Sequence, residues 1–463
     1  MKRIIYLLIA ILVIGCNSPK KKVEGTDCCP KPVPIQKSET VYPDWSTDAT
    51  IYEVNIRQYT PEGTFAAFEK HLPRLKELGV EILWLMPIHP ISKEKRKGTL
   101  GSYYAVADYE GVNPEFGTMD DFKHLVTTAQ GMGFKVILDW VANHTGWDNP
   151  WIYKHPEWFT KDSTGKIIPP NPDWSDIADL NFDVPEMRRA MIDALKFWIT
   201  ETGIDGYRCD VAWGVPTDFW NDARMALDSL KPVWMLAEDE DHKDFLVKAF
   251  NCNYSWSLHH KLNQIAQGKD SISAIKKWFA AFDTIYPEGS YAMQFTSNHD
   301  ENSWQGTEYE RMGDAAKTFA ALTFVIPGMP LIYSGQEAAL NKRLLFFEKD
   351  QIDWSNLEMQ EFYKKLVALK KENKALWNGS AGAPIHFLHM GQNNSMLVFD
   401  RTMEGSKVVG IFNLSASPVS NTVGCPRIAG NYVDALTGAE LTFEQGQPFE
   451  LKPWEYHIFI EKQ

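Results

Sequence analysis

The chain has little of what nucleic-acid-binding, zinc-binding or disulfide-stapled proteins need. Lysine and arginine number 47 against 60 aspartate and glutamate residues, which gives a net charge of −13. Nucleic acid requires a basic face, so no nucleic-acid partner is expected. The six cysteines include no Cys-x-x-Cys pair and no Cys/His cluster with zinc spacing. We therefore expect neither a zinc site nor a disulfide framework, and no organic cofactor.

The N-terminus lacks an apolar run long enough to span a bilayer, because residues 4–14 are too few. Lys2 and Arg3 precede this run, and Val13-Ile14-Gly15-Cys16 ends it in a pattern similar to a bacterial lipobox. Residues 1–15 are predicted to be a signal peptide, and residues 16–45 a lipidated tether rich in lysine, proline and serine. The expected product is a secreted lipoprotein, anchored to a membrane through lipid on Cys16, in the periplasm or at the cell surface. An ordinary signal peptide with a chance cysteine is the alternative.

Apolar strands and amphipathic helices alternate along residues 46–376. A helix should begin at Thr64 and end at Gly79, and another should be capped by Thr118 with Asp121. A third should open with a capping box of Asp183 and Glu186. Buried strands separated by helices indicate a parallel sheet covered on both faces, and eight such units favour a closed (β/α)8 barrel of the α/β class. The expected strands cover residues 51–56, 80–86, 134–138, 204–208, 233–237, 253–256, 291–296 and 330–333.

Two segments depart from this alternation. A short insertion after strand three, residues 144–183, lacks regular periodicity but is rich in aromatics, which suit either a sugar-binding face or packing alone. Its aromatic residues are Trp147, Trp151, Tyr153, Trp158, Phe159 and Trp174. After residue 376, short strands follow one another without helices. Residues 377–463 are therefore predicted to form a C-terminal antiparallel β-sandwich.

Polar residues at the ends of four predicted strands carry the chemistry. Strand three ends in Asp139-Trp140-Val141-Ala142-Asn143-His144, and strand four in Gly206-Tyr207-Arg208-Cys209-Asp210. Strand five ends in Leu236-Ala237-Glu238, and strand seven in Ser297-Asn298-His299-Asp300. Parallel strands of a barrel bring their carboxyl ends to one mouth, so these carboxylates are expected to share one site.

In order and spacing, these four segments resemble the motif regions of the α-amylase family, glycoside hydrolase family 13. The resemblance extends from about residue 48 to the C-terminus. It includes Ile177-Ala178-Asp179-Leu180-Asn181, similar to the fifth family motif, and Gly335-Gln336-Glu337 after strand eight.

The resemblance implies the roles of the carboxylates. Asp210 resembles the nucleophile, Glu238 the general acid/base, and Asp300 the carboxylate that holds sugar hydroxyls. Arg208 lies two residues before Asp210 on the same strand face and is expected to keep it ionised. A nucleophile paired with an acid/base implies retention of the anomeric configuration.

Further residues are expected to bind the sugar. Tyr104 resembles the tyrosine that stacks beneath the reacting glucose, while His144 and His299 resemble ligands of its hydroxyls. Trp213 and Gly214 stand where many members have Lys-His on the leaving-group side. Trp213 can offer a stacking face there, or can pack against the insertion or helix four.

Valine at position 211, directly after the nucleophile, is similar to the choice in family members that act on α-1,6 bonds or on both linkages. Asn143 and Asp179 match family calcium ligands, and the Gly214 carbonyl is a third candidate. The resemblance therefore implies a structural calcium ion at these residues, although the sequence offers no further clear carboxylate ligand.

These features predict a retaining α-glucan hydrolase that acts on starch, maltodextrins or related oligosaccharides through a covalent glycosyl-enzyme. A transglycosylase or isomerase on the same scaffold is one alternative. A glucan-binding lipoprotein without catalysis is another.

Overall fold

The computed structural model describes residues 36–388, 395–423, 426–444 and 446–462. Cys16, Cys28, Cys29 and Cys425 lie outside these ranges, and so does the predicted signal peptide. Within them, Cys209 and Cys252 are buried and free. The membrane-span search covered the same ranges and found no helix with the length and apolarity to cross a bilayer.

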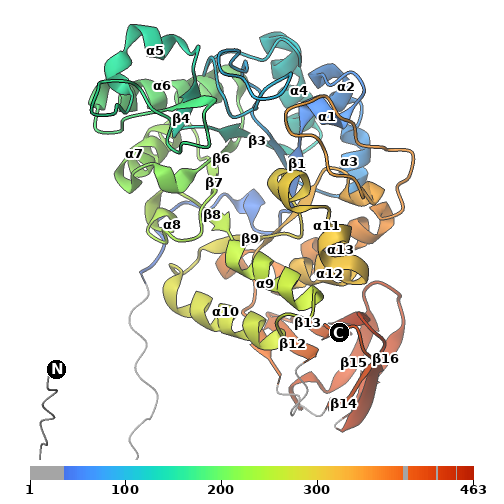
Figure 1. Ribbon diagram of the computed structural model, residues 1–463. Helices are drawn as coiled ribbons and strands as arrows, with labels where there is room; N and C mark the ends of the chain where they lie inside the picture. The colour runs from blue at the N-terminus through green and yellow to red at the C-terminus, as the bar shows by residue number, and fades with distance from the viewer. Residues whose placement is uncertain (1–35, 389–394, 424–425, 445, 463) are drawn as a thin grey trace, which may run out of the picture. The chain divides into compact units, whose positions relative to one another are not determined.

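The core is a closed barrel of parallel strands, as the alternation predicted (Figure 1). Its strands pair in the order β1-β10-β9-β8-β7-β6-β3-β2. They are short and buried, because helices cover their outer faces and packed side chains fill the interior. Their bounds are β1 (Ile51–Val54), β2 (Ile82–Leu85), β3 (Lys135–Trp140), β6 (Gly206–Cys209), β7 (Trp234–Ala237), β8 (Cys252–Tyr254), β9 (Tyr291–Gln294) and β10 (Met329–Tyr333).

The helices surround this barrel and place apolar residues against it. The principal ones are α4 (Met119–Gly131), α6 (Pro185–Thr202), α7 (Thr217–Asp228), α9 (Trp256–Ala266), α10 (Ile272–Ile285), α12 (Ala316–Val325) and α13 (Gln360–Glu372). Shorter ones are α1 (Ile56–Tyr59), α2 (Phe65–Glu69), α3 (Leu72–Leu78), α5 (Pro150–Lys154), α8 (Phe245–Lys248) and α11 (Glu308–Met312). Helix α4 begins with the predicted capping box, in which Thr118 and Asp121 each bond to the other's backbone N–H.

Several local predictions were wrong. Ile56, expected in strand one, begins helix α1. The helix expected from Thr64 to Gly79 is two helices, α2 and α3, because Pro73 stands in a first turn and favours a new start. The capping box expected at Asp183 is absent: Val184 is the N-cap of α6 and makes no side-chain cap bond. Pro185 occupies the first helical position, so Asp183 lies one residue too early. Trp256, expected in strand six, begins helix α9.

The insertion after β3 holds a small antiparallel pair of strands, β4 (His144–Gly146) and β5 (Ile177–Asp179). The C-terminal region is antiparallel, as predicted, and has more strands than the sequence indicated. One sheet has the order β11-β12-β13-β18-β15-β16, and β14 pairs with β17. The bounds are β11 (His386–Phe387), β12 (Met396–Met403), β13 (Ser406–Asn413), β14 (Val419–Val423), β15 (Gly430–Asp434), β16 (Glu440–Phe443), β17 (Gln447–Leu451) and β18 (Tyr456–Glu461).

Two buried basic side chains lie at the junction of the barrel and the C-terminal sheet, and Arg401 is the one that bonds across it. Arg401 of β12 donates to the carbonyls of Ala383 at 2.9 Å and of Val325, the last residue of α12, at 3.3 Å. Lys370 of α13 donates to the carbonyls of Leu376 at 2.7 Å and Gly328 at 3.1 Å. Burial lowers the pKa of Arg401 to about 9 and that of Lys370 well below its ordinary value. Backbone carbonyls therefore solvate both cations at this junction.

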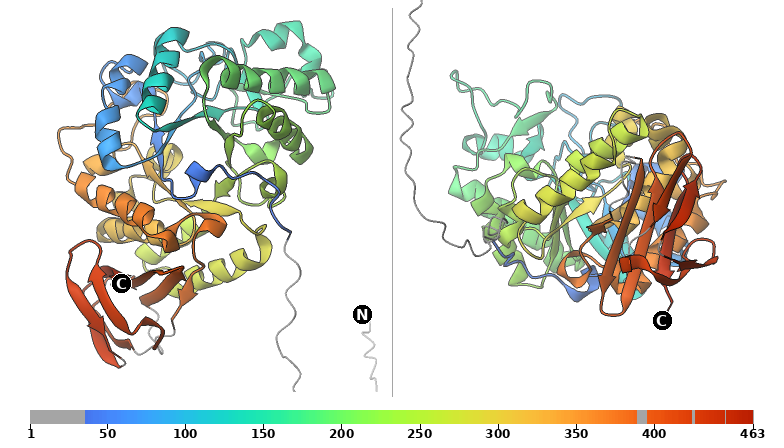
Figure 2. Two further views of the ribbon diagram at one scale, coloured as in Figure 1. Left: turned by 180° about the vertical axis from the view of Figure 1, so that it is seen from behind. Right: turned by 90° about the horizontal axis from the view of Figure 1, so that it is seen from below.

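Residues 36–46, most of them placed in the tether by the sequence, contact the barrel at the N-terminal ends of its strands (Figure 2, left). Ser38 N–H donates to the carbonyl of Glu288, just before β9, at 3.0 Å. The Val41 carbonyl accepts from Asn251, just before β8, at 2.8 Å. The Tyr42 ring lies 5.6 Å from that of Tyr291, centroid to centroid. This segment thus lies at the end of the barrel opposite the C-terminal strand ends.

Candidate active site

A cleft of about 860 Å³ opens at the C-terminal ends of the barrel strands. Seven of the predicted site residues line it, namely Tyr104, His144, Asp210, Trp213, Glu238, His299 and Asp300. Arg208 and Asp139 are fully buried beside them. The structure therefore brings together in one cleft residues that are spread over nearly 200 positions of the sequence.

Arg208 is the centre of the charge network. Its Nη1 lies 2.8 Å from Asp139 Oδ1 and 2.9 Å from Asp210 Oδ1, and its Nη2 lies 3.0 Å from Glu238 Oε1. The fixed fork of a guanidinium suits such simultaneous contacts. Arg208 and Asp210 face the same side because alternate residues of a strand share a face. The predicted pairing of Arg208 with Asp210 is present, and it extends to Glu238.

Burial governs the protonation of the two carboxyls. It raises the pKa of Asp210 well above its ordinary value, the charge of Glu238 raises it further, and Arg208 opposes both. The pKa of Glu238 is raised by burial and by Asp300, again against Arg208. Burial and the neighbouring carboxylates thus favour the protonated form of each carboxyl, and the guanidinium of Arg208 favours the ionised form of each. This balance of opposing effects allows one of the two carboxyls to be ionised while the other holds a proton.

Val211, directly after Asp210, has a φ of +43°, which is rare for a β-branched residue. Such a conformation costs on the order of 1–3 kcal/mol and persists only where the surroundings impose it. Here the Val211 N–H donates to Glu238 Oε2 at 2.8 Å. The strained backbone at Val211, directly after Asp210, thus orients the Glu238 carboxyl.

His299 lies between two carboxylates. Its Nδ1 contacts Glu53 of β1, and its Nε2 lies 3.4 Å from Asp300 Oδ2 and 2.8 Å from the Tyr104 hydroxyl. Burial alone lowers the pKa of His299, but Asp300 and Glu53 raise it to about 9. His299 is therefore a cation at neutral pH. By contrast, burial lowers the pKa of His144 to about 3, which leaves it neutral.

Asp139, the first residue of the strand-three motif, supports the site from below. Its Oδ2 accepts from the Tyr104 hydroxyl at 3.0 Å and from Trp84 Nε1 at 3.1 Å. It is fully buried and does not line the cleft. Asp139 therefore fixes Tyr104 and Arg208 rather than contacting substrate.

Sequence reasoning missed residues beneath the cleft and along its walls. Glu53, which contacts His299 from below, is a buried acid inside an otherwise apolar strand, and that mismatch is the one signal that could have indicated it. Aromatic and charged residues outside the predicted motifs line the cleft, namely Lys97, Asp239, Glu240, Asp241, His242, Trp256, Trp304, Phe346 and Phe347. Of the insertion aromatics, Trp174 lines the cleft, whereas Trp147, Trp158 and Phe159 are buried. Packing thus accounts for much of that aromatic surplus.

The candidate calcium residues meet in a separate pocket of about 320 Å³. Asn143, Asp179 and Gly214 line it together with Asn171. A Cβ at Gly214 would come within 2.4 Å of Asn143 Oδ1, so only glycine leaves this amide oxygen open. Among the described residues, no group of three or more His, Cys, Asp or Glu could hold a metal ion. Any cation here would rest on one carboxylate with amide and backbone oxygens, which are donors that Ca²⁺ accepts.

Comparisons with known proteins agree with this geometry. The model of the α-amylase catalytic domain matches residues 40–171 and 171–375. The crystal structure of an α-amylase from Lactobacillus plantarum has a TM-score of 0.81 and 29% identity, over 90% of this chain and 99% of that one.

Two relatives are similar in sequence. An α-amylase from Haloarcula japonica is 27% identical in an alignment 428 positions long that covers 86% of this chain and 61% of that protein. This chain thus spans less than two thirds of that relative. Neopullulanase 2 from Thermoactinomyces vulgaris is 26% identical in an alignment 483 positions long, gaps included, that covers 91% of this chain and 79% of that protein.

Proposed function

Since this chain belongs to the α-amylase family, we propose that it hydrolyses α-glucosidic bonds in starch, maltodextrins or related oligosaccharides with retention of configuration. The observation that carries this proposal is the guanidinium of Arg208, held between Asp210 and Glu238 at 2.9 and 3.0 Å, in a cleft that Asp300 also lines. Binding alone does not require such a set of buried carboxyls around one cation.

The reaction follows from the two carboxyls. An oxygen of Asp210 attacks C1 of the glucose held over Tyr104, while Glu238 transfers its proton to the departing glycosidic oxygen. The glycosidic bond breaks, and a glycosyl ester of Asp210 forms. Glu238, now ionised, removes a proton from water, whose oxygen attacks C1 and releases Asp210. Two inversions at C1 retain the α configuration.

The surroundings hold the reacting sugar in place and keep its nucleophile ionised. Asp300 and the cationic His299 are placed to hydrogen-bond its hydroxyls, and both line the cleft. Arg208 lies 2.9 Å from Asp210 and favours its ionised form. This keeps Asp210 nucleophilic before it attacks C1 and makes it a good leaving group when water displaces it. Such fixed dipoles and charges lower the barrier without reorganising during the reaction.

A product time course with amylose, pullulan and panose tests the activity and its linkage preference. We expect shorter glucans from at least one substrate, with the newly formed anomer observed by NMR as α before mutarotation. Products longer than the substrate would instead identify a transglycosylase. Binding without any product would contradict catalysis and favour a glucan-binding protein.

We propose that the pocket of Asn143, Asp179 and Gly214 holds a structural Ca²⁺ ion. The oxygen donors and the requirement for glycine at 214 support this. Bound calcium would tie the insertion to the loop after Asp210. Removal by EDTA should lower the thermal unfolding midpoint, and added Ca²⁺ should restore it in the wild type but not in Asp179→Asn. An unchanged midpoint in the wild type would contradict the site.

We also propose that lipid on Cys16 anchors the protein to a membrane. The support is the Val13-Ile14-Gly15-Cys16 pattern after a short apolar run. The full chain should partition into a detergent phase, and Cys16→Ala should remain aqueous or fail to mature. Mass spectrometry that finds an unmodified mature N-terminus at another residue would contradict the anchor.

A further inference from the structure

Three aromatic residues that the mechanism does not use form one wall of the cleft. Trp304 is 50% exposed, and its ring centroid lies 5.2 Å from that of Phe346 and 5.7 Å from that of Phe347. The Phe346 ring is nearly parallel to that of Tyr104, with an interplanar angle of 12° and a centroid separation of 6.2 Å. The rings of Tyr104, Trp304, Phe346 and Phe347 all line the cleft. Phe346 and Phe347 also pack edge to face on each other. A sugar beside Tyr104 therefore meets a second aromatic surface.

The turn that carries Trp304 is held by hydrogen bonds of the two residues that precede this tryptophan. Trp304 stands in a π-helical turn, η4 (Glu301–Gln305), that begins directly after Asp300. Asn302 bonds to the carbonyl of Lys342 and the N–H of Leu344, and Ser303 bonds to the Leu344 carbonyl. These bonds hold the turn against the loop that carries Phe346. Such preorganised surfaces bind without an ordering cost.

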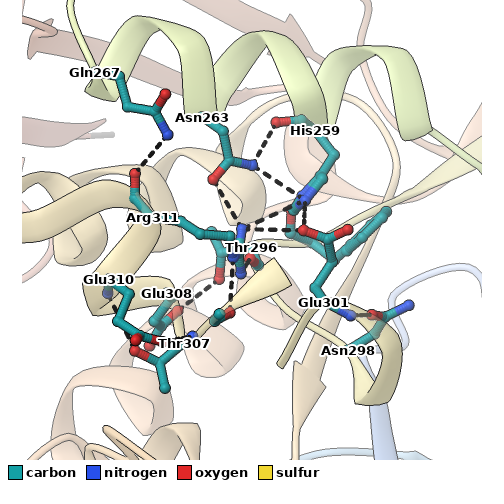
Figure 3. A network of polar contacts seen from close by, with 12 residues as sticks. His259, Asn263, Gln267, Thr296, Asn298, Glu301, Thr307, Glu308, Glu310 and Arg311 are labelled. Carbon is teal, nitrogen blue, oxygen red and sulfur yellow. Dashed lines mark hydrogen bonds and ion pairs between the residues drawn. The ribbon is translucent and has the colours of Figure 1, made fainter. Parts of the chain in front are cut away.

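A polar network beneath the turn anchors its first residue (Figure 3). The Glu301 carboxylate lies 2.9 Å from His259 Nε2 of α9 and 3.4 Å from Arg311 Nη1. The Glu301 N–H donates to Asn298 Oδ1 at 2.7 Å. Single π-helical turns leave the regular helical ladder and often mark functional sites, and this one presents the exposed indole of Trp304 to the cleft.

The strand order places this wall on the side of the cleft away from Glu238. Glu238 follows β7, and Trp213 follows the adjacent β6. Trp304 and Phe346 follow β9 and β10. An acid must stand beside the bond to the leaving group, so the leaving group lies near β6 and β7. The part of the glucan retained on the enzyme then extends toward Trp304.

Three ties hold the loop of residues 97–101, which lies beside this wall, to the segments around it. Lys97 Nζ lies 2.9 Å from Asp176 Oδ1 of the insertion. Leu100 N–H donates to the Phe347 carbonyl at 3.1 Å, and both the N–H and hydroxyl of Thr99 bond to Glu348. Gly98, with φ of +63°, packs so closely that a Cβ would meet Phe347 Cβ at 2.4 Å. The loop of residues 97–101 is therefore locked onto residues 346–348.

We propose that Trp304 and Phe346 bind the glucose unit next to the one over Tyr104 on the retained side, and that the locked loop ends the site there. This rests on the proposed function. The enzyme then prefers a glycone of two glucose units, and a third has no room. The specificity-determining residue is Trp304, because it supplies the exposed face.

The test uses 4-nitrophenyl α-glucoside, α-maltoside and α-maltotrioside, which share a leaving group and differ only in glycone length. In the wild type, kcat/KM for nitrophenol release should rise from glucoside to maltoside and fall at maltotrioside, because the closed end leaves no room for a third retained glucose unit. Trp304→Ala should lower the maltoside-to-glucoside ratio about tenfold, as expected for the loss of one ring contact, and Trp304→Phe should restore most of it. Trp213→Ala, which removes a similarly exposed indole from the leaving-group side, should leave this ratio unchanged.

An unchanged ratio in Trp304→Ala would overturn the platform, and an equal or higher value at maltotrioside would overturn the closed end. Calorimetry with maltotriose and the Glu238→Gln variant separates this proposal from the catalytic one. Absence of hydrolysis in the wild type would refute the proposed function alone. Equal maltotriose affinity with and without Trp304 would refute the platform whether or not the protein is an enzyme.

Discussion

Replacing Arg208 by methionine should move the pH–rate profile toward higher pH. Arg208 lowers the pKa of Asp210 and of Glu238, so its removal raises both. Activity needs ionised Asp210. When its pKa is raised, the ionised fraction is lost at a higher pH as the solution is acidified. The acidic limb should therefore shift upward, and the basic limb, set by the proton on Glu238, should shift in the same direction.

The size of the shift follows from the contact distances. The guanidinium nitrogens lie 2.9 Å from Asp210 and 3.0 Å from Glu238. With charge centres about 4 Å apart and an effective dielectric constant of about 20, each attraction is about 4 kcal/mol. At about 1.4 kcal/mol per pKa unit, this corresponds to roughly three units. Water that enters the vacated space screens the remaining charges, so we expect a shift of roughly one to two units.

The measurement is kcat/KM against pH for 4-nitrophenyl α-maltoside, because this parameter reports the free enzyme. Arg208→Lys serves as the matched control, since it keeps the charge and loses the fork. Both variants should lose turnover, but the lysine variant should shift its limbs much less. Circular dichroism checks that each variant is folded. A folded methionine variant with measurable activity and unshifted limbs would refute the electrostatic role of Arg208.

Three further outcomes are expected. Asp210→Asn and Glu238→Gln should each reduce kcat by roughly 10²–10⁴ with unchanged circular dichroism, and wild-type turnover in either, with contamination excluded, would remove its assigned role. Trp213→Ala should lower kcat/KM for maltohexaose by roughly 1–2 kcal/mol and hardly affect a short chromogenic glucoside, whereas equal losses would make Trp213 structural. Arg401→Met should lower the free energy of unfolding by about 2–4 kcal/mol, because buried carbonyls lose their donor. Lys374→Met, which breaks an exposed ion pair with Glu404, is the control and should lower the free energy of unfolding by less than about 1 kcal/mol. Thermal unfolding of both variants measures the difference.

The barrel could be predicted because its signals are local and repeated. Most strands are short apolar runs, and the predicted helices carry apolar residues at helical spacing. For α4, the predicted cap at Thr118 and the buried face of Phe122, Leu125, Val126 and Ala129 are both present. Boundaries were less accurate, since hydrogen-bond pairing ends a strand before its apolar run ends. The break between α2 and α3 and the missing box at Asp183 depended on where a proline falls within a first turn. The C-terminal strands β14, β16 and β17 are half-exposed and short, so periodicity gave them little weight.

The site divides in the same way. Asp210, Glu238 and Asp300 could be located because each ends a recognisable strand, and the barrel brings strand ends together. The contact of Glu53 with His299 joins positions 246 residues apart, and nothing in the spacing indicates it. The same holds for Trp304 against Phe346, which depends on the packing of two loops. Residues that act through tertiary contacts therefore need the structure.

The seating of residues 36–46 determines how an anchored molecule would face its surroundings. The chain enters the fold at the N-terminal ends of the barrel strands, and the cleft opens at the opposite pole. Any attachment made through the N-terminal part of the chain would therefore meet the described fold at the pole opposite the cleft. Residues 36–46 leave the mouth of the cleft uncovered, so a bulky glucan can approach it without meeting this segment.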